Sequence, residues 1–189
     1  MHRESRVDDI VRQAMAKWPT VPACYGWLGL DARGNWYMRD ERAQAAGDFG
    51  GGPPGARGSL LRHEKLIDFI GRNFACDEQG RWYFQNGPQR VFVELETTPW
   101  IWRVELDGTV RAHTGASAEV LACEIDEEGR VYLHTTLGFG LVHTQDVGRL
   151  AELIEAGCWT PVEVSRAQLA HRHRYILSPQ RDSNPSEGT

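Results

Sequence analysis

The sequence predicts an α+β fold in which short antiparallel strands dominate and two closely packed subdomains repeat one hairpin-plus-helix unit. An Asp-x-x-Gly turn with a following strand occurs three times, as LDARGNWYM (30–38), CDEQGRWYF (76–84) and IDEEGRVYL (125–133). An amphipathic helix pattern follows the first and third copies after a loop. Other segments alternate apolar and polar residues with the period of two that is typical of half-buried strands. Because short hairpin connections outnumber crossovers, we expect antiparallel pairing.

Hairpin chemistry explains the repeated Asp-x-x-Gly core. A type I turn closed by a glycine at positive φ fits this spacing. An aspartate at the first turn position can bond the backbone two residues on, and glycine alone enters the left-handed region without strain. We therefore interpret the repeat as architecture rather than as a binding motif.

Composition restricts the class of protein. The chain has 189 residues, is 41% hydrophobic and contains seven tryptophans, which is enough apolar material for a real core. A net charge of −5 argues against a dedicated nucleic-acid binder. No apolar run approaches the roughly 18 residues of a membrane span, and no signal-peptide stretch is visible, so a cytoplasmic location is expected. The four cysteines stand singly and are expected to be reduced thiols.

The first third of the chain predicts two helices separated by a loop. Residues 5–18 carry an apolar stripe at helical spacing, with Ser5 as N-cap and Pro19 after the end. The stretch GDFGGGPPGARG (47–58) is too rich in glycine and proline for a regular element and lacks the G-K-[ST] of a phosphate-binding loop, so a flexible connector is expected. Ser59 is predicted to cap the second helix. Its apolar residues are Leu61, Leu66, Phe69, Ile70 and Phe74.

From Arg90 onward strands dominate, and one further helix is expected. Thr144 is predicted to cap that helix and Gly157 to end it. The expected strands cover 91–95, 100–106, 110–113, 120–125 and 131–135. The resulting organisation is an N-terminal helix (1–22), a first hairpin/helix subdomain (23–75), a second β-rich subdomain with a closing helix (76–160), a C-terminal segment (161–177) and a flexible tail (178–189).

This layout resembles an uncharacterised bacterial domain-of-unknown-function family built from duplicated α/β units. The resemblance rests on the order and spacing of Gly34–Tyr37, Gly80–Phe84 and VFVELETTPW (91–100), and it covers about residues 25–160. It implies two related subdomains, the C-terminal one similar to a pleckstrin-homology barrel. It also implies a nucleotide-like ligand in a groove between the subdomains and a role in signalling. The glycine–proline loop and a His/Arg-rich C-terminal segment depart from the family's pattern.

Aromatic residues beside the turns are the main candidates for ligand binding. Alternation within each Trp-Tyr pair sends one ring to the core and the other outward. Outward rings that lie next to arginine or histidine side chains can stack a planar ligand. The candidate residues are Trp36, Trp82, Trp100, Trp102, Arg103, Arg130 and His113.

No catalytic constellation is recognisable in the sequence. There is no G-x-S-x-G elbow, and Gly138-Phe139-Gly140 is too short for a dinucleotide fingerprint. The carboxylates Glu94, Glu96 and Glu105 lie on neighbouring predicted strands and suit acid–base work, although exposure to solvent explains Glu94 and Glu96 without a function.

Histidines offer a second, weaker chemistry. His171 and His173 alternate in a predicted strand and could share a metal, but no acidic or cysteine partner is nearby in the sequence. The basic stretch 166–174 is interpreted as a solvated face rather than an RNA contact, because it lacks an aromatic sheet motif.

The sequence therefore favours a non-catalytic module that binds a small, nucleotide-like ligand or a protein partner and acts in signalling. The alternative is a small metal-dependent hydrolase that uses His113, His143 and carboxylates of the Glu94–Glu105 region. A third hypothesis is a structural protein that dimerises through its sheet edges. Neither a cofactor nor an oligomeric state is predicted by any pattern in the chain.

Overall fold

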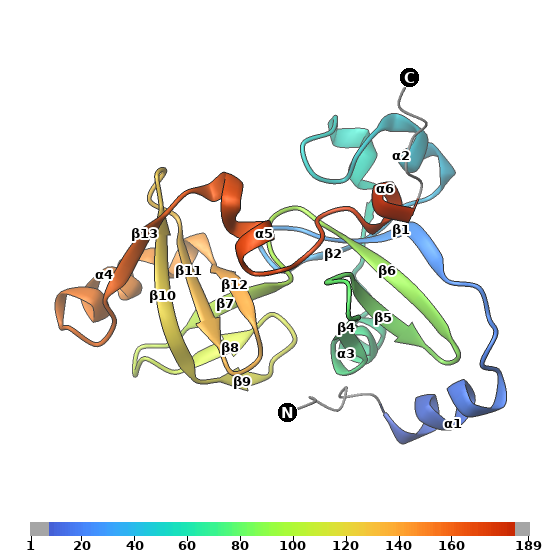
Figure 1. The fold of residues 1–189 in the computed structure, drawn as a ribbon, viewed down its shortest axis with the longest axis horizontal. Helices are drawn as coiled ribbons and strands as arrows, with labels where there is room; N and C mark the ends of the chain where they lie inside the picture. Colours follow the sequence, from blue (N-terminus) through green and yellow to red (C-terminus); the bar gives the residue numbers. More distant parts are fainter. Residues whose placement is uncertain (1–7, 184–189) are drawn as a thin grey trace. The chain divides into compact units, whose positions relative to one another are not determined.

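A computed structural model describes residues 8–183, which divide into two compact units (Figure 1). Unit 1 contains the described residues of 1–31, 35–96 and 175–189, and unit 2 contains residues 32–34 and 97–174. The main boundary follows residue 96 and so differs from the predicted boundary at residue 76. The reason is that the strands between residues 74 and 95 complete the sheet of unit 1.

Unit 1 is built on a mixed six-stranded sheet with the order β3-β2-β1-β6-β5-β4. Strands β1 and β6 run parallel to each other, with Leu28 opposite Val93. All other neighbouring strands of this sheet run antiparallel. The strands are β1 (Cys24–Leu30), β2 (Trp36–Met38), β3 (Ser59–Leu60), β4 (Phe74–Cys76), β5 (Trp82–Asn86) and β6 (Gln89–Leu95).

The helices of unit 1 are short. They are α1 (Asp9–Lys17), α2 (Glu41–Ala46), the 3-10 turn η1 (Pro54–Arg57), α3 (Glu64–Arg72) and α6 (Pro179–Ser183). The predicted N-terminal helix is confirmed as α1, while its expected cap, Ser5, lies outside the described residues. Helix α3 begins later than predicted because Ser59 and Leu60 pair with β2, and the His63 ring accepts the capping bond from the Leu66 N–H.

Unit 2 is built on a mixed seven-stranded sheet that curls into a half-barrel. The order is β13-β10-β11-β12-β7-β8-β9. Its strands are β7 (Trp100–Val104), β8 (Val110–Ala112), β9 (Ser117–Ala118), β10 (Val120–Asp126), β11 (Val131–Thr135), β12 (Phe139–Val142) and β13 (Pro161–Val164). Its helical segments are η2 (Thr144–Asp146), α4 (Val147–Glu155), η3 (Arg166–Gln168) and α5 (Leu169–Arg172).

The prediction of an α+β fold is confirmed, but purely antiparallel pairing is not. Three strand pairs run parallel, namely β1–β6, β12–β7 and β10–β13. Hairpin connections account for the antiparallel pairs, as expected. The parallel pairs join strands that are far apart in the chain, so no local turn pattern predicts these pairings.

The strand order of the two units is the same. Replacing β1–β6 by β7–β12 converts the order of the first sheet into that of the second, apart from the added edge strand β13. Each sheet consists of two three-stranded meanders joined by a parallel pair. The turn before Gly80 therefore corresponds to the turn before Gly129, and the turn before Gly34 corresponds to the one before Gly108, a fourth copy that the sequence showed only as a short hairpin signal.

The corresponding turns in the two units use the same hydrogen bonds. In unit 1, Asp77 Oδ1 accepts from the Arg81 N–H (2.9 Å) and Oδ2 accepts from Arg81 Nε (2.8 Å). In unit 2, Asp126 makes both bonds to Arg130, each at 2.9 Å. Gly80 and Gly129 have φ of 84° and 78°, the left-handed conformation that the turn requires. Local turn chemistry therefore accounts for the repeated phrase.

The glycine–proline loop 47–58, predicted to be a flexible connector, is instead fastened by Arg39. This side chain is 1% exposed. Its Nε donates to the Ala56 carbonyl (2.7 Å), its Nη1 to the Gly26 carbonyl (3.1 Å) and its Nη2 to the Gly47 carbonyl (2.7 Å). Phe49, near the start of the loop, is buried over β1.

Two C-terminal predictions also differ from the structure. Residues 166–172 form η3 and α5 rather than a strand, and residues 178–183, expected to begin a flexible tail, include α6 and contact β1 and β6. Buried Tyr175 and Pro179 hold this segment on unit 1. The rest of the predicted tail, 184–189, lies outside the described residues.

Candidate functional site

The two predicted ligand-binding tryptophans of unit 1 contact Phe74. Trp36 is 2% exposed and meets the Phe74 ring edge-on, with centroids 5.4 Å apart. Trp82 is half-buried, and its ring lies 4.8 Å from that of Phe74. Of the two, Trp82 is the one whose ring remains partly accessible.

Three further predicted residues lie together in unit 2. Trp100 stacks on Trp102 with centroids 5.7 Å apart, and His113 lies 5.7 Å from Trp100. Trp102 is fully buried, and its Nε1 donates to the Leu133 carbonyl (3.1 Å). Burial lowers the pKa of His113 to about 3, and its Nδ1 accepts from the Ile101 N–H (3.3 Å). His113 is therefore a neutral imidazole near pH 7.

The two predicted arginines are engaged by aspartates of unit 2. Arg103 Nε lies 2.6 Å from Asp146 Oδ2, and Arg130 Nε lies 2.9 Å from Asp126 Oδ2. The seven predicted residues are thus divided, with Trp36 and Trp82 in unit 1 and the other five in unit 2.

The residues of the hydrolase alternative are also placed by the structure. Glu94 is buried in unit 1, where its Oε1 accepts from the Gln180 N–H (2.9 Å), while His143 of unit 2 accepts from the Gln145 N–H and caps η2. Within residues 8–183, no three His, Cys, Asp or Glu side chains gather as a metal-binding group.

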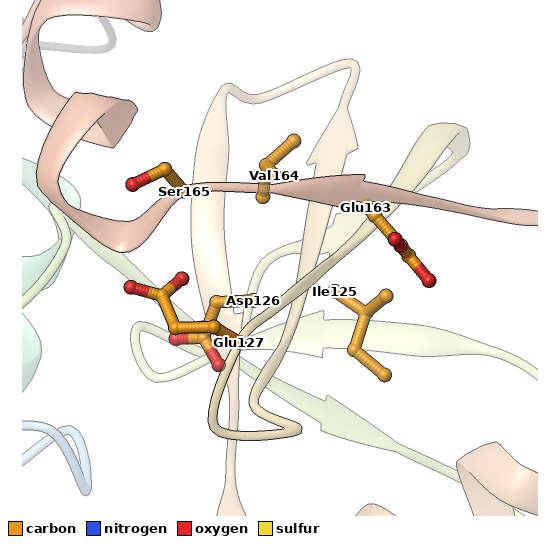
Figure 2. A pocket seen from close by; sticks show the side chains of 6 residues that line it. All are labelled: Ile125, Asp126, Glu127, Glu163, Val164 and Ser165. Atoms are coloured by element: carbon orange, nitrogen blue, oxygen red, sulfur yellow. The ribbon is translucent and has the colours of Figure 1, made fainter.

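A hollow opens where the parallel strands β10 and β13 end in unit 2 (Figure 2). Its volume is about 560 Å³. Figure 2 shows Ile125 and Glu163 on one side, and Asp126, Glu127 and Ser165 gathered at the strand ends. We call this cavity the β10–β13 hollow. It is lined by Ile125, Asp126, Glu127, Glu163, Val164 and Ser165.

Hydrogen bonds hold the carboxylate of Asp126 in its ionised form. Burial alone would raise its pKa, but donation from the Arg130 backbone and side chain and from the Tyr132 hydroxyl lowers it below its ordinary value. The Tyr132 hydroxyl lies 2.9 Å from Asp126 Oδ2. The pKa of Tyr132 is raised by burial and by this hydrogen bond, so the hydroxyl keeps its proton.

Glu127 and Glu163 supply accessible charge at the rim. Glu127 Oε2 accepts from the Arg166 N–H (2.9 Å), and this bond lowers the pKa of Glu127. Glu163 is exposed and lies opposite Ile125 in the strand register. Arg130 and Arg166 are the guanidinium groups beside the hollow, and both also pair with Glu128. The carboxylates of the lining, together with Glu128, outnumber these two groups, so the net charge around the hollow is negative.

A second polar cluster on the same unit joins α5 to the sheet. Glu124 of β10 is buried, and its carboxylate lies 2.8 Å from His173 Nε2 and 3.2 Å from Arg172 Nε. The His173 ring stacks on Phe139 at 3.6 Å between centroids. The basic stretch 166–174 therefore includes two side chains that bind a buried carboxylate, in addition to exposed ones.

Sequence reasoning did not find the hollow. Its residues come from the end of β10 and the following turn, and from the end of a short edge strand about forty positions away, and no local pattern predicts that β13 runs parallel to β10. The sequence pattern predicted Asp126 only as the aspartate of an Asp-x-x-Gly turn. Alternation of charged and apolar residues in PVEV was the one signal available.

The fold and hollow define a two-unit α+β protein with an acidic surface recess. No helix among residues 8–183 combines the length and the apolar character that crossing a bilayer requires. The chain belongs to the family described as "Protein of unknown function (DUF2946)", whose model matches residues 7–185.

Two solved structures are similar to this chain. One is a DUF1285 family protein from Silicibacter pomeroyi DSS-3, with 15% identity and a TM-score of 0.47, covering 78% of this chain and 85% of that one. The other is a DUF1285 family protein from Shewanella baltica OS155, with 13% identity and a TM-score of 0.44, covering 67% and 91%. No curated protein matches the chain.

Proposed function

We propose that this protein is a non-catalytic binding module whose β10–β13 hollow receives a cationic group of a small ligand or of a partner protein. The observation that carries the proposal is a recess at the end of a parallel strand pair whose lining includes three carboxylates. Two of them, Asp126 and Glu127, have lowered pKa values and stay ionised.

The lining suits an ammonium group on an alkyl chain. The exposed carboxylates of Glu127 and Glu163 can accept its hydrogen bonds, while Ile125 and Val164 offer apolar contact to the carbon chain. The hollow is open to solvent, so each ion pair contributes only about 0–1 kcal/mol and two or more are needed for useful affinity. A diamine, a polyamine or a lysine side chain meets this requirement.

Phosphate does not suit the same recess, because its charge would be repelled by the carboxylates. The nucleotide-like ligand, the signalling role and the pleckstrin-homology likeness stay predictions that the family resemblance implies. Of the predicted aromatic and basic residues, Trp82, Arg103 and Arg130 are the best placed for contact, since Arg103 is exposed and the other two are half-buried.

Calorimetric titration with spermidine tests the proposal. We expect binding that weakens with added salt and that falls several-fold in Glu163→Gln and Glu127→Gln. Glu155→Gln is the matched control, because Glu155 is an exposed glutamate of α4 in the same unit. Equal spermidine affinity in all four proteins, or tighter binding of ATP than of spermidine at the hollow, would refute it.

A further inference from the structure

The segment of residues 175–183, YILSPQRDS, returns to unit 1 after the chain has built unit 2. We call it the returning segment. Its backbone is bonded to unit 1 at two points. The Ile176 N–H donates to the Gly80 carbonyl (2.9 Å), and the Leu95 N–H donates to the Leu177 carbonyl (2.8 Å). Both hydrogen bonds join backbone groups and involve no side chain, as in the binding of an extended peptide to a sheet.

Side chains add selectivity to this contact. Tyr175 and Pro179 are buried, whereas Leu177 between them is 42% exposed. Anchors that alternate with an exposed residue are typical of a peptide lying on a folded surface. The core of unit 1 therefore does not absorb the whole segment.

Gln180 is held in a slot formed by a glycine and two polar side chains. Its N–H donates to Glu94 Oε1 (2.9 Å), and its Nε2 donates to Gln44 Oε1 (3.0 Å). A Cβ on Gly26 would lie 2.5 Å from Gln180 Nε2, so the Gln180 amide occupies the space that a larger residue at position 26 would take. At the rim, Arg181 pairs with Asp48, with Nε 3.1 Å from Oδ1.

The returning segment is joined to unit 2 through Arg174. This is the only non-glycine residue among residues 8–183 with a positive φ, at 53°. A left-handed conformation is strained for a residue with a Cβ. The connection is thus a single strained residue at the boundary between the units, so the segment can leave unit 1 without breaking a strand pair of unit 2.

We infer that the face of unit 1 beneath the returning segment is a peptide-binding site, which the chain fills with its own segment here and which accepts the same segment from a second copy of this chain. The recognised sequence has a buried aromatic residue, a proline four positions later, and then glutamine and a basic residue. This inference concerns unit 1 and is independent of the cation-binding hollow of unit 2.

The internal occupant competes with any external one. A free peptide binds only the fraction of molecules whose returning segment is detached, so its apparent affinity falls in proportion to that fraction. Weakening the internal segment should therefore strengthen binding of the free peptide. A site that merely holds the C-terminus as part of an inseparable core would not show this inverse relation.

The test uses the full chain and a fluorescein-labelled synthetic peptide of residues 174–183, followed by fluorescence anisotropy. Gln180→Glu in the protein replaces the amide that donates to Gln44 Oε1 by a carboxylate, which removes this bond and loosens the internal segment. We expect this variant to bind the wild-type peptide about tenfold more tightly than the unmodified protein does. Gln168→Glu is the matched control, because it makes the same change at an exposed residue of unit 2 and should leave the affinity unchanged.

A charge exchange locates the bound peptide. In a protein that carries Gln180→Glu, the added change Asp48→Arg should weaken the wild-type peptide and strengthen a peptide carrying Arg181→Asp, each by a few-fold. Asp48 is exposed, so its replacement leaves the core intact. Absence of peptide binding to the Gln180→Glu protein, or binding that ignores the charge exchange, overturns the inference.

Light scattering tests whether a second copy of this chain donates the segment. We expect dimers whose fraction rises with concentration and which dissociate when the peptide is added in excess. A Gln180→Glu protein that binds the peptide but stays monomeric at every concentration would overturn the assignment of a second copy as the occupant.

Discussion

Replacing Arg39 by methionine should destabilise unit 1 strongly, because three buried carbonyl groups share this one side chain. The guanidinium donates to Gly26, Gly47 and Ala56 over 2.7–3.1 Å. A buried acceptor that loses its donor costs about 1–3 kcal/mol. Methionine keeps most of the side-chain volume, so little of the effect arises from a cavity. With part of the loop rehydrating at Gly47, we expect a loss of about 4 kcal/mol in the free energy of unfolding.

Urea denaturation followed by tryptophan fluorescence measures this loss. Arg42→Met is the matched control, because Arg42 lies on the exposed side of α2 and should change stability by no more than about 0.5 kcal/mol. Hydrogen exchange in residues 47–58 should also accelerate in the Arg39 variant alone. A loss below about 1 kcal/mol would mean that the loop does not depend on the guanidinium and would refute the reasoning.

Three further predictions concern single positions. A Cβ at Gly140 would lie 2.6 Å from Trp102 Nε1 and closer still to the Trp100 carbonyl oxygen, so Gly140→Ala should cost about 3 kcal/mol or more, whereas Gly148→Ala, in open space on α4, should raise the melting temperature. Tyr132→Phe removes the hydroxyl bond to a buried carboxylate and should cost about 1 kcal/mol by urea unfolding, more than the same change at Tyr83, the corresponding tyrosine of unit 1. Burial raises the pKa of Glu94 above its ordinary 4.5, so the folded state binds that proton more tightly than the unfolded state and stability falls as pH rises through this range. Glu94→Gln should remove the fall, which urea midpoints at about pH 4 and pH 7 would show, and an unchanged slope would contradict it.

Local chemistry explains which parts of the fold could be predicted. The Asp-x-x-Gly turns, the strand at 91–95 and the helix that ends near Gly157 follow from signals contained within a few residues, and all are present. The pairing of β1 with β6 is different, because its two strands are more than fifty positions apart and its register depends on the finished sheet. The domain boundary at 76 was misplaced for this reason.

The same physics limits prediction of the candidate site. The sequence showed Asp126 as part of a turn, but only the parallel pairing of β13 brings Glu163 beside it. Loop 47–58 has the composition of a flexible connector, and the residue that fastens it, Arg39, lies outside the loop. Aromatic residues were easier to notice than to interpret, since burial of Trp36 and Trp102 depends on neighbours that are distant in the chain.

The route of the chain also sets an order of assembly during synthesis. Unit 1 lacks its last piece until residues 175–183 have been made, and all of the residues 97–174 are made first. At translation speeds of about 5–20 residues per second, Gln180, the contact partner of Glu94, is made roughly 4–17 s after Leu95. During that interval a carboxylate that the finished protein buries faces water, and the nascent unit 1 presents an open surface to chaperones and to neighbouring chains.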